Sequence, residues 1–253
     1  MNHNILNEIQ EKIKDADLVL IGIGEQVAIP TRLMDTDEKY AKIFGKNMKT
    51  EYYPYLQQIF IKENKEKYIE FYNRLYGLIE NKNYYVITTN VDDVIYDSKI
   101  DTERIVAPCG SIHQFVCNEC KGAIEIFEND NISGNQELLE NEGTSNFTVM
   151  KCPVCRKIMQ PNIVSYEYYD ENGYLEKWSK YTKWLQGTVN KKLCILELGV
   201  GLNYPTVVRW PNERIVTYNN KAYMYRVHEK LYQLSEGIGD RAKSVPENPM
   251  AII

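Results

Sequence analysis

Residues 84–92 read Tyr-Tyr-Val-Ile-Thr-Thr-Asn-Val-Asp, and this stretch decides the fold. Its first four residues are apolar or aromatic, which predicts a short buried β-strand. The strand leads directly into the polar side chains of Thr89, Asn90 and Asp92. Open α/β sheets bind ligands beyond the carboxyl ends of their strands. The stretch therefore predicts a strand of a parallel sheet with a ligand-binding segment at its end.

Other segments repeat this pattern of an apolar strand that ends in a glycine or polar turn. The predicted strands are Leu18–Ile21 before Gly22-Ile23-Gly24, Arg104–Ala107, Leu193–Leu198 before Gly199-Val200-Gly201, and Arg214–Tyr218 before Asn219. Helical spacing of apolar residues predicts helices at 4–14, at 66–80 and around 178–185, whereas the charged, tyrosine-rich stretch 35–65 is predicted to be irregular. Strands that alternate with helices predict an α/β fold with a Rossmann-like, doubly wound parallel sheet.

The glycine turn after the first strand is a candidate phosphate site. Backbone N–H groups at Gly22 and Gly24 can approach a diphosphate closely. Val27 stands where the dinucleotide fingerprint has its third glycine, so a plain strand-to-helix turn is an alternative. The amide of Asn90 and the carboxylate of Asp92 suit a carboxamide and ribose hydroxyls, although an Asx turn before the next helix is also consistent with them. Because these groups all follow strand ends, together they favour a nucleotide site.

Four of the six cysteines form two pairs, Cys117-x-x-Cys120 and Cys152-x-x-Cys155. Two such pairs provide four thiolates in the tetrahedral arrangement that Zn²⁺ prefers. An iron–sulfur cluster is a less common use of this pattern, and a redox CxxC motif normally appears once. Because four protein ligands leave no open coordination position, the zinc is predicted to be structural. The charged stretch 121–151 between the pairs is predicted to be a solvated loop.

The predicted zinc ribbon covers residues 115–157 and interrupts a Rossmann-like domain made of residues 1–114 and 158–253. The net charge of −5 and a pI of about 5.4, without a basic stripe, argue against nucleic-acid binding. No signal peptide is apparent, and no uncharged apolar run approaches the roughly 20 residues that cross a bilayer. The sequence therefore predicts a cytoplasmic protein without a membrane partner.

These motifs resemble those of the sirtuins and follow the order of that family from about residue 17 to residue 245. The segment 88–92 is similar to the family's T-Q-N-I-D, Cys109-Gly110-Ser111 before the first cysteine pair is similar to H-G-S, and Gln160-Pro161-Asn162-Ile163-Val164 after the second pair is similar to R-P-x-V-V. Residues 198–202 stand in the place of the G-T-S-L turn, Asn219 in that of the asparagine near the adenosine ribose, and Gly239-Asp240 in that of the G-D loop beside the adenine.

The resemblance implies that NAD is bound at a defined set of positions. These are Gly22, Gly24, Arg32, Thr89, Asn90, Asp92, Gly199, Gly201, Asn219 and Asp240. The family's G-A-G-I-S…G-I-P-x-F-R loop corresponds to residues 22–32, which form a shorter loop that carries Glu25 close to the expected phosphates. A carboxylate beside a diphosphate is unfavourable. We therefore expect Glu25 to point away from the phosphates, or NAD to bind weakly or differently.

Cys109 stands where deacetylating sirtuins carry a catalytic histidine, which removes a proton from a ribose hydroxyl. A thiol with an ordinary pKa of about 8.5 is mostly protonated at neutral pH and replaces imidazole poorly. His113 lies four residues further on and is predicted to face into the zinc module; the alternative is that it reaches the site from a neighbouring turn.

Within the sirtuins, Thr88–Asp92 and Glu197–Asn203 with Pro205 are most similar to the macrodomain-linked microbial branch, class M. That branch implies a protein mono-ADP-ribosyltransferase, with a macrodomain protein or a modified carrier protein as the partner. The expected function is transfer of ADP-ribose from NAD to a protein acceptor with release of nicotinamide, and the predicted catalytic residues are Asn90, Asp92 and Cys109. The alternatives are an inactive nucleotide- or protein-binding module and, third, an NAD-dependent protein deacylase.

Overall fold

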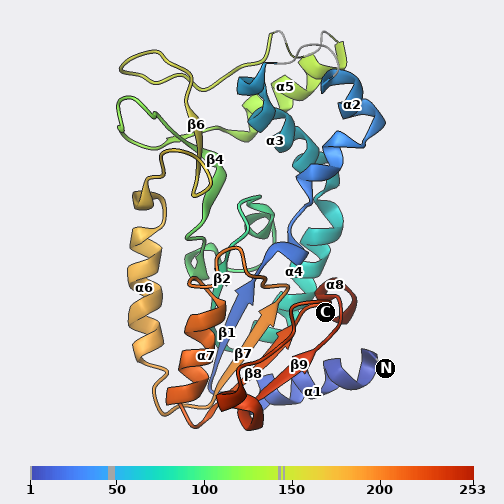
Figure 1. The fold of residues 1–253 in the computed structure, drawn as a ribbon, viewed down its shortest axis with the longest axis vertical. Helices are drawn as coiled ribbons and strands as arrows, with labels where there is room; N and C mark the ends of the chain where they lie inside the picture. The colour runs from blue at the N-terminus through green and yellow to red at the C-terminus, as the bar shows by residue number, and fades with distance from the viewer. Residues whose placement is uncertain (1, 45–48, 142–143, 145) are drawn as a thin grey trace.

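The computed structural model describes residues 2–44, 49–141, 144 and 146–253. Figure 1 shows two parts, a large parallel sheet with helices on both faces below and a smaller, mixed unit above. Residues 45–48 of the stretch that was predicted to be irregular lie outside the described part. Within that part, no helix is long and apolar enough to cross a membrane.

The large sheet has six strands, and every neighbouring pair is parallel. Across the sheet the order is β3 (Ile105–Val106), β2 (Asn83–Thr88), β1 (Leu18–Ile23), β7 (Leu193–Leu198), β8 (Ala222–Val227) and β9 (Ala242–Val245). The chain moves outward from β1 in one direction and outward from β7 in the other, so the order reverses between these two strands. A crevice at this reversal is where doubly wound sheets bind ligands. The predicted α/β parallel sheet is confirmed.

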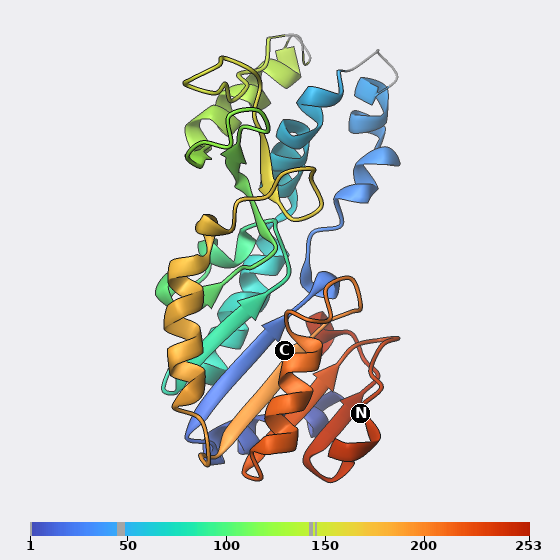
Figure 2. The ribbon, with the colours of Figure 1, turned by 60° about the vertical axis from the view of Figure 1, so that its left-hand side comes forward.

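Helices cover both faces of this sheet (Figure 2). One face carries α1 (Asn2–Asp15), α4 (Glu66–Ile79) and α8 (Pro249–Ile252), and the other carries α6 (Leu175–Gln186) and α7 (Arg209–Tyr218). The alternating side chains of β1 explain both layers. Val19 and Ile21 belong to the core cluster that includes residues of α1 and α4, whereas Leu18 and Leu20 belong to a second cluster with Tyr181 of α6. Each such burial stabilises the fold by about 1.5–3 kcal/mol.

The smaller unit contains an antiparallel sheet in the order β5 (Glu125–Ile126), β4 (Gly110–Val116) and β6 (Gln160–Ile163). The helices α2 (Glu38–Phe44), α3 (Tyr53–Asn64) and α5 (Asn129–Asn141) complete it. Tyr55 of α3 stacks on Phe115 of β4 with ring centroids 5.5 Å apart and meets Phe127 edge-on at 4.9 Å. Aromatic pairs of this geometry join the helix to the sheet.

Two predictions for this unit were wrong. The stretch 35–65 forms α2 and α3 instead of irregular chain, and residues 129–141 of the predicted solvated loop form α5. In both cases the charged residues obscured apolar residues at helical spacing, such as Leu56, Ile59 and Phe60 in α3 and Ile132 and Leu139 in α5, all of which are buried.

Single 3₁₀ turns link these elements: η1 (Glu25–Val27), η2 (Thr31–Asp35), η3 (Thr50–Tyr52), η4 (Val94–Asp97), η5 (Thr102–Arg104), η6 (Glu171–Gly173) and η7 (Glu236–Arg241). The strand β4 begins before the predicted limit 115 of the zinc ribbon, and its partner β6 lies wholly beyond the limit 157. The limits of the two domains therefore stay a prediction.

The predicted strand Arg214–Tyr218 is instead the second half of helix α7. Its β-branched residues favour a strand locally, but the buried positions Arg209, Asn212 and Val216 have the spacing of three and four residues that a helix requires. The strand that follows is β8, which begins only at Ala222.

Candidate functional site

The four paired cysteines form a metal-binding cluster in the small unit. The sulfur atoms of Cys117, Cys120, Cys152 and Cys155 all lie within 4.8 Å of one another. Each pair closes a tight turn, in which Lys121 and Arg156 have φ angles of 47° and 63° and donate backbone N–H groups to the carbonyls of Cys117 and Cys152 at 2.9 Å. Four soft donors in two such turns fit Zn²⁺ in a closed, structural site. The predicted metal ligands are therefore brought together.

Asn90 and Asp92 lie beyond the carboxyl end of β2 and are buried. The carboxylate of Asp92 accepts backbone N–H groups from Ile29 at 3.0 Å and from Val94 at 3.2 Å. Burial raises the pKa of Asp92 to about 6, while these two hydrogen bonds act in the opposite direction. In the described part of the chain, the amide nitrogen of Asn90 makes no hydrogen bond of regular geometry, and the buried hydroxyl of Tyr72 is the group that interacts with this side chain.

This pair fits the carboxamide and hydroxyl groups of a dinucleotide. A carboxylate has about four acceptor positions, so Asp92 can accept a further N–H group besides those of Ile29 and Val94. A buried amide donor without a partner is costly to leave unsatisfied. The donor of Asn90 is occluded and lines neither cavity described below, so a ligand hydroxyl reaches it only after neighbouring groups move. Thr89 is held nearby, because its backbone N–H donates to the carbonyl of Ile23 at 3.0 Å.

The glycine turns after β1 and β7 pack directly against each other. A Cβ atom on Gly24 would lie 2.4 Å from the Cα atom of Val200, and one on Gly199, whose φ is +67°, would lie 2.6 Å from the Cβ atom of Gln26. Gly199 and Gly24 are therefore required for this close approach. The turn after β7 also presents the N–H group of Gly201 at the crevice between β1 and β7.

Glu25 occupies that N–H group. Its carboxylate accepts from the backbone nitrogen of Gly201 at 3.0 Å, and a Cβ atom on Gly201 would lie 1.6 Å from a carboxylate oxygen of Glu25. An internal anion therefore lies on a backbone donor of the kind that binds phosphates, which is the case for which weak or different NAD binding is expected.

Gly22 has a packing role at the other end of the same turn. It lies within β1, and a Cβ atom there would come within 2.5 Å of the Cγ1 atom of Val208, at the start of α7. The absence of a side chain thus lets α7 approach the sheet. Arg32 lies in η2 with an exposed side chain and does not line either cavity described below.

Asn219 and Asp240 are at the wrong edge of the sheet for the predicted site. Asn219 ends α7 and donates its side-chain amide to the carbonyls of Thr188 and Lys191, at 3.0 and 3.1 Å, before β7 begins. Asp240 lies in η7, directly before β9, and is exposed. Both therefore lie at the amino ends of parallel strands. For Asn219 the reason is that the predicted strand before it is a helix.

The residue that follows the carboxyl end of β8 is His228, which the sequence reasoning missed. Its Nδ1 atom accepts the backbone N–H groups of Lys230 and Leu231 at 3.1 and 3.0 Å, and burial lowers the pKa of its imidazole. The signal available in the sequence was the mostly apolar segment 222–227 directly before it.

Cys109 does not have the surroundings of a base. It is 1% exposed, and burial raises the pKa of its thiol to about 12. The thiol therefore stays protonated at neutral pH. This argues against the catalytic role predicted for Cys109.

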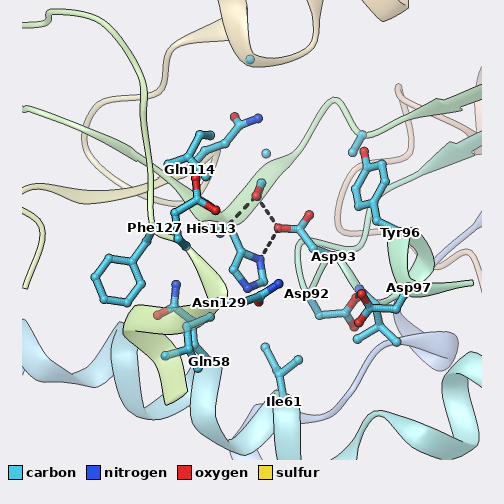
Figure 3. Close-up of a pocket in the computed structure, with 18 of the residues that line it drawn as sticks. Gln58, Ile61, Asp92, Asp93, Tyr96, Asp97, His113, Gln114, Phe127 and Asn129 are labelled. Carbon is cyan, nitrogen blue, oxygen red and sulfur yellow. Dashed lines mark hydrogen bonds and ion pairs between the residues drawn. The ribbon is translucent and has the colours of Figure 1, made fainter. Parts of the chain in front are cut away.

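His113 faces a cavity of about 590 Å³ that lies between the two units (Figure 3). Its Nδ1 atom lies 2.7 Å from a carboxylate oxygen of Asp93, which also accepts the hydroxyl hydrogen of Ser111. Asp92 lines this cavity as well. The prediction that His113 faces the zinc module was wrong, because β4 alternates its side chains and directs this one toward the segment after β2.

Solved structures of similar fold are sirtuins. A structure described as Sir2Tm bound to a propionylated peptide matches with a TM-score of 0.52 and 14% identity, covering 97% of this chain and 94% of that chain. Another, described as showing the structural basis of sirtuin substrate affinity, matches with a TM-score of 0.54 and 15% identity over 97% of both chains. At these identities the likeness concerns the fold alone.

Two relatives are similar in sequence. A protein of Staphylococcus aureus (strain Mu50 / ATCC 700699) named "Protein ADP-ribosyltransferase" is 20% identical over 97% of this chain and 84% of its own length. A protein of Fusarium oxysporum f. sp. cubense named "Probable bifunctional ADP-ribose hydrolase/ADP-ribosyltransferase" is 27% identical over 52% of this chain and 23% of its own length.

The match to a family model covers the segment 88–92 and the cysteine cluster. The model is that of the Sir2 family, and it matches residues 25–195, well over half of the chain. The protein belongs to the Sir2 (sirtuin) family, whose members use NAD.

Proposed function

We propose that this protein transfers ADP-ribose from NAD to a protein acceptor and releases nicotinamide. The observation that carries the proposal is the buried pair after β2, in which the amide donor of Asn90 makes no hydrogen bond of regular geometry and Asp92 retains acceptor capacity. The names of the two relatives support the same reaction. The acceptor is unknown; a macrodomain protein or a modified carrier protein remains a proposal from the family resemblance.

In this proposal Asn90 donates to a hydroxyl of the nicotinamide ribose, and Asp92 accepts from the carboxamide. NAD supplies a C1′–nitrogen bond that breaks with departure of neutral nicotinamide. The protein holds the two reacting partners in place, which alone can contribute about 7–11 kcal/mol to lowering a barrier. Loss of the usual histidine is compatible with such transfer, whereas deacylation needs the proton transfer that the protonated thiol of Cys109 does not provide.

A non-catalytic nucleotide-binding or protein-binding module is the second candidate. The contact that favours it is the carboxylate of Glu25 on the N–H group of Gly201, because this anion competes with a diphosphate for the same donor. An NAD glycohydrolase assay separates the two candidates. A mass-spectrometric search for O-acetyl-ADP-ribose tests deacylation separately.

The first test is calorimetric titration of the zinc-loaded protein with NAD. We expect Asp92→Ala to abolish binding, and Asp240→Ala and Asn219→Ala to bind as the wild type does, because these two residues lie at the opposite edge of the sheet. Absence of binding by the wild type up to millimolar NAD would contradict the proposal. Loss of binding in Asp240→Ala with retention in Asp92→Ala would place NAD elsewhere.

A further inference from the structure

The contact between His113 and Asp93 joins two elements that are distant in sequence. Asp93 precedes η4 with a left-handed φ of 61°, yet its carboxylate does not cap that turn. It instead accepts from Ser111 of β4 and lies 2.7 Å from Nδ1 of His113. A carboxylate at Nδ1 fixes the imidazole tautomer with its proton on Nδ1, which leaves the lone pair of Nε2 free.

One acceptor atom without a partner is exposed at this cavity, and a second lies buried in its wall. Among the described residues, none bonds to Nε2 of His113, whose side chain is 26% exposed. Gln58 of α3 lines the cavity too; it is 2% exposed, its Nε2 donates to the carbonyl of Ile112 at 2.8 Å, and its Oε1 has no partner. A ligand hydroxyl that enters the cavity can donate to Nε2 of His113, whereas Oε1 of Gln58 is reached only if its side chain turns.

This cavity adjoins the proposed nucleotide site. A second cavity, of about 280 Å³, lies against the loop that contains Ala28 and Ile29. Asp92 and Ile61 line both cavities and form their shared wall. A donor held in the smaller cavity by Asp92 and an acceptor that enters through the larger one would therefore meet at this wall.

We propose that His113, positioned by Asp93, is the general base that activates a hydroxyl-bearing acceptor, a serine or threonine side chain, for ADP-ribose transfer. This inference rests on the proposed function. A carboxylate acceptor would be repelled by Asp92 and Asp93 and would need no base. A lysine acceptor would enter as an ammonium ion, which imidazole deprotonates poorly.

The step balances without another reactant. The acceptor oxygen forms a bond to C1′ of the ribose, the C1′–nitrogen bond breaks, and its electron pair leaves with neutral nicotinamide. The hydroxyl proton moves to Nε2 of His113, where the negative charge of Asp93 stabilises the imidazolium until solvent removes the proton. In this role His113 is a catalytic residue and Asp93 a positioning residue.

Among the described charged groups that line the cavity, Asp93 is the one that contacts the imidazole of His113 directly. The titratable groups that line the cavity are Lys62 of α3, Lys65 between α3 and α4, Asp92 and Asp93, Tyr96 and Asp97 of η4, Glu128 before α5, Tyr169 and Tyr174, and Lys177 of α6. Each lysine is held by another group: Lys62 by Ser133 at 2.8 Å, Lys65 by Asp97 at 2.7 Å and Lys177 by the carbonyl of Thr102 at 2.8 Å.

The test uses the full zinc-loaded chain, NAD, and N-acetylserine N-methylamide as the acceptor probe, with the adduct and free nicotinamide measured by mass spectrometry. We expect His113→Ala to reduce adduct formation about 100-fold, to bind NAD as the wild type does, and to recover activity with added imidazole, which fits the vacated space.

Asp93→Asn keeps the shape of the side chain but removes its charge, so the acid limb of the pH–rate profile should move to lower pH. Val189→Ala, at a position that is 63% exposed and lines neither cavity, should keep the wild-type rate.

Adduct formation at the wild-type rate in His113→Ala would overturn the proposal. So would a loss that imidazole does not relieve, together with an unmoved acid limb in Asp93→Asn, because that result indicates a purely structural contact. If the wild type binds NAD and makes the adduct but His113→Ala does too, only the role of His113 fails. If the wild type neither binds nor consumes NAD, the proposed function fails and this inference fails with it.

Discussion

At the scale of single residues, the contact between Glu25 and Gly201 bears on the proposed NAD site. The carboxylate occupies a backbone donor at the crevice between β1 and β7 and must leave before a diphosphate can bind there. We expect Glu25→Gln to lower the Kd for NAD about tenfold, equivalent to about 1.4 kcal/mol, because the neutral amide does not repel phosphate. Calorimetric titration measures this, with Glu236→Gln in η7 as the control. Weaker binding in Glu25→Gln would instead show that the carboxylate contacts a ligand hydroxyl.

The buried carboxyl group of Asp92 makes the stability of the protein depend on pH. Burial raises its pKa from 3.8 to about 6, so the ionised carboxylate lowers the free energy of unfolding above pH 6. Below about pH 4 the group is protonated in both states, and this cost disappears. Asp92→Asn should therefore stabilise the protein without ligand at pH 7.5, by at most about 3 kcal/mol at roughly 1.4 kcal/mol per pH unit. The gain should shrink as the pH falls from 6 to 4. Urea unfolding at several pH values measures it, and Asp240→Asn, at an exposed position, should show no such trend.

The residues of the site differ in how far they could be predicted. Asn90 and Asp92 directly follow an apolar strand, so their place at a strand end follows from local sequence. The contacts of Glu25 with Gly201 and of Asp93 with His113 depend on which strands are neighbours, and the sequence pattern carries no such information. Asn219 was misplaced because one helix was predicted to be a strand, which reverses the edge of the sheet at which the next loop lies.

At the scale of elements, runs of apolar residues predicted the strands β1, β2 and β7, which are buried on both faces over most of their length. It failed for α7, where the run Ile215-Val216-Thr217 favours a strand. The surroundings overrode that preference, because the start of α7 packs over Gly22 of β1 and its buried positions need a helical repeat. Local propensity is a weak guide where tertiary packing decides the element.

The pairing of β4 with β6 depends on Gly110, the residue at its start. Its φ is +99°, and a Cβ atom would lie 2.0 Å from the backbone oxygen of Asn162. We expect Gly110→Ala to destabilise the protein by about 3 kcal/mol or more, because strain and a backbone clash add. Gly77→Ala, in the interior of α4 with nothing within 4 Å of the new methyl group, should instead stabilise it by about 0.5–1 kcal/mol. Denaturant unfolding of both variants measures the difference, and an equal effect would contradict it.

At the scale of the whole molecule, one buried core joins the two units. The cluster that contains Ile9 of α1 and Phe71 of α4 continues through Phe115 to the metal ligands Cys117 and Cys152. A structural zinc contributes to folding free energy directly. Because no break separates the cores, loss of zinc should destabilise the large sheet as well as the small one.

Removal of the metal tests this coupling. We expect one zinc ion per chain by elemental analysis, and after chelation a single unfolding transition at a lower Tm, recorded by circular dichroism and calorimetry. Cys117→Ser should have the lowered Tm already and should not respond further to the chelator, because its cluster has lost a ligand. Two separate transitions, with the large sheet melting at its original temperature, would show that the units fold independently. In that case the two walls of the 590 Å³ cavity would move independently. The distance from His113 to the proposed nucleotide site would then not be fixed by the fold.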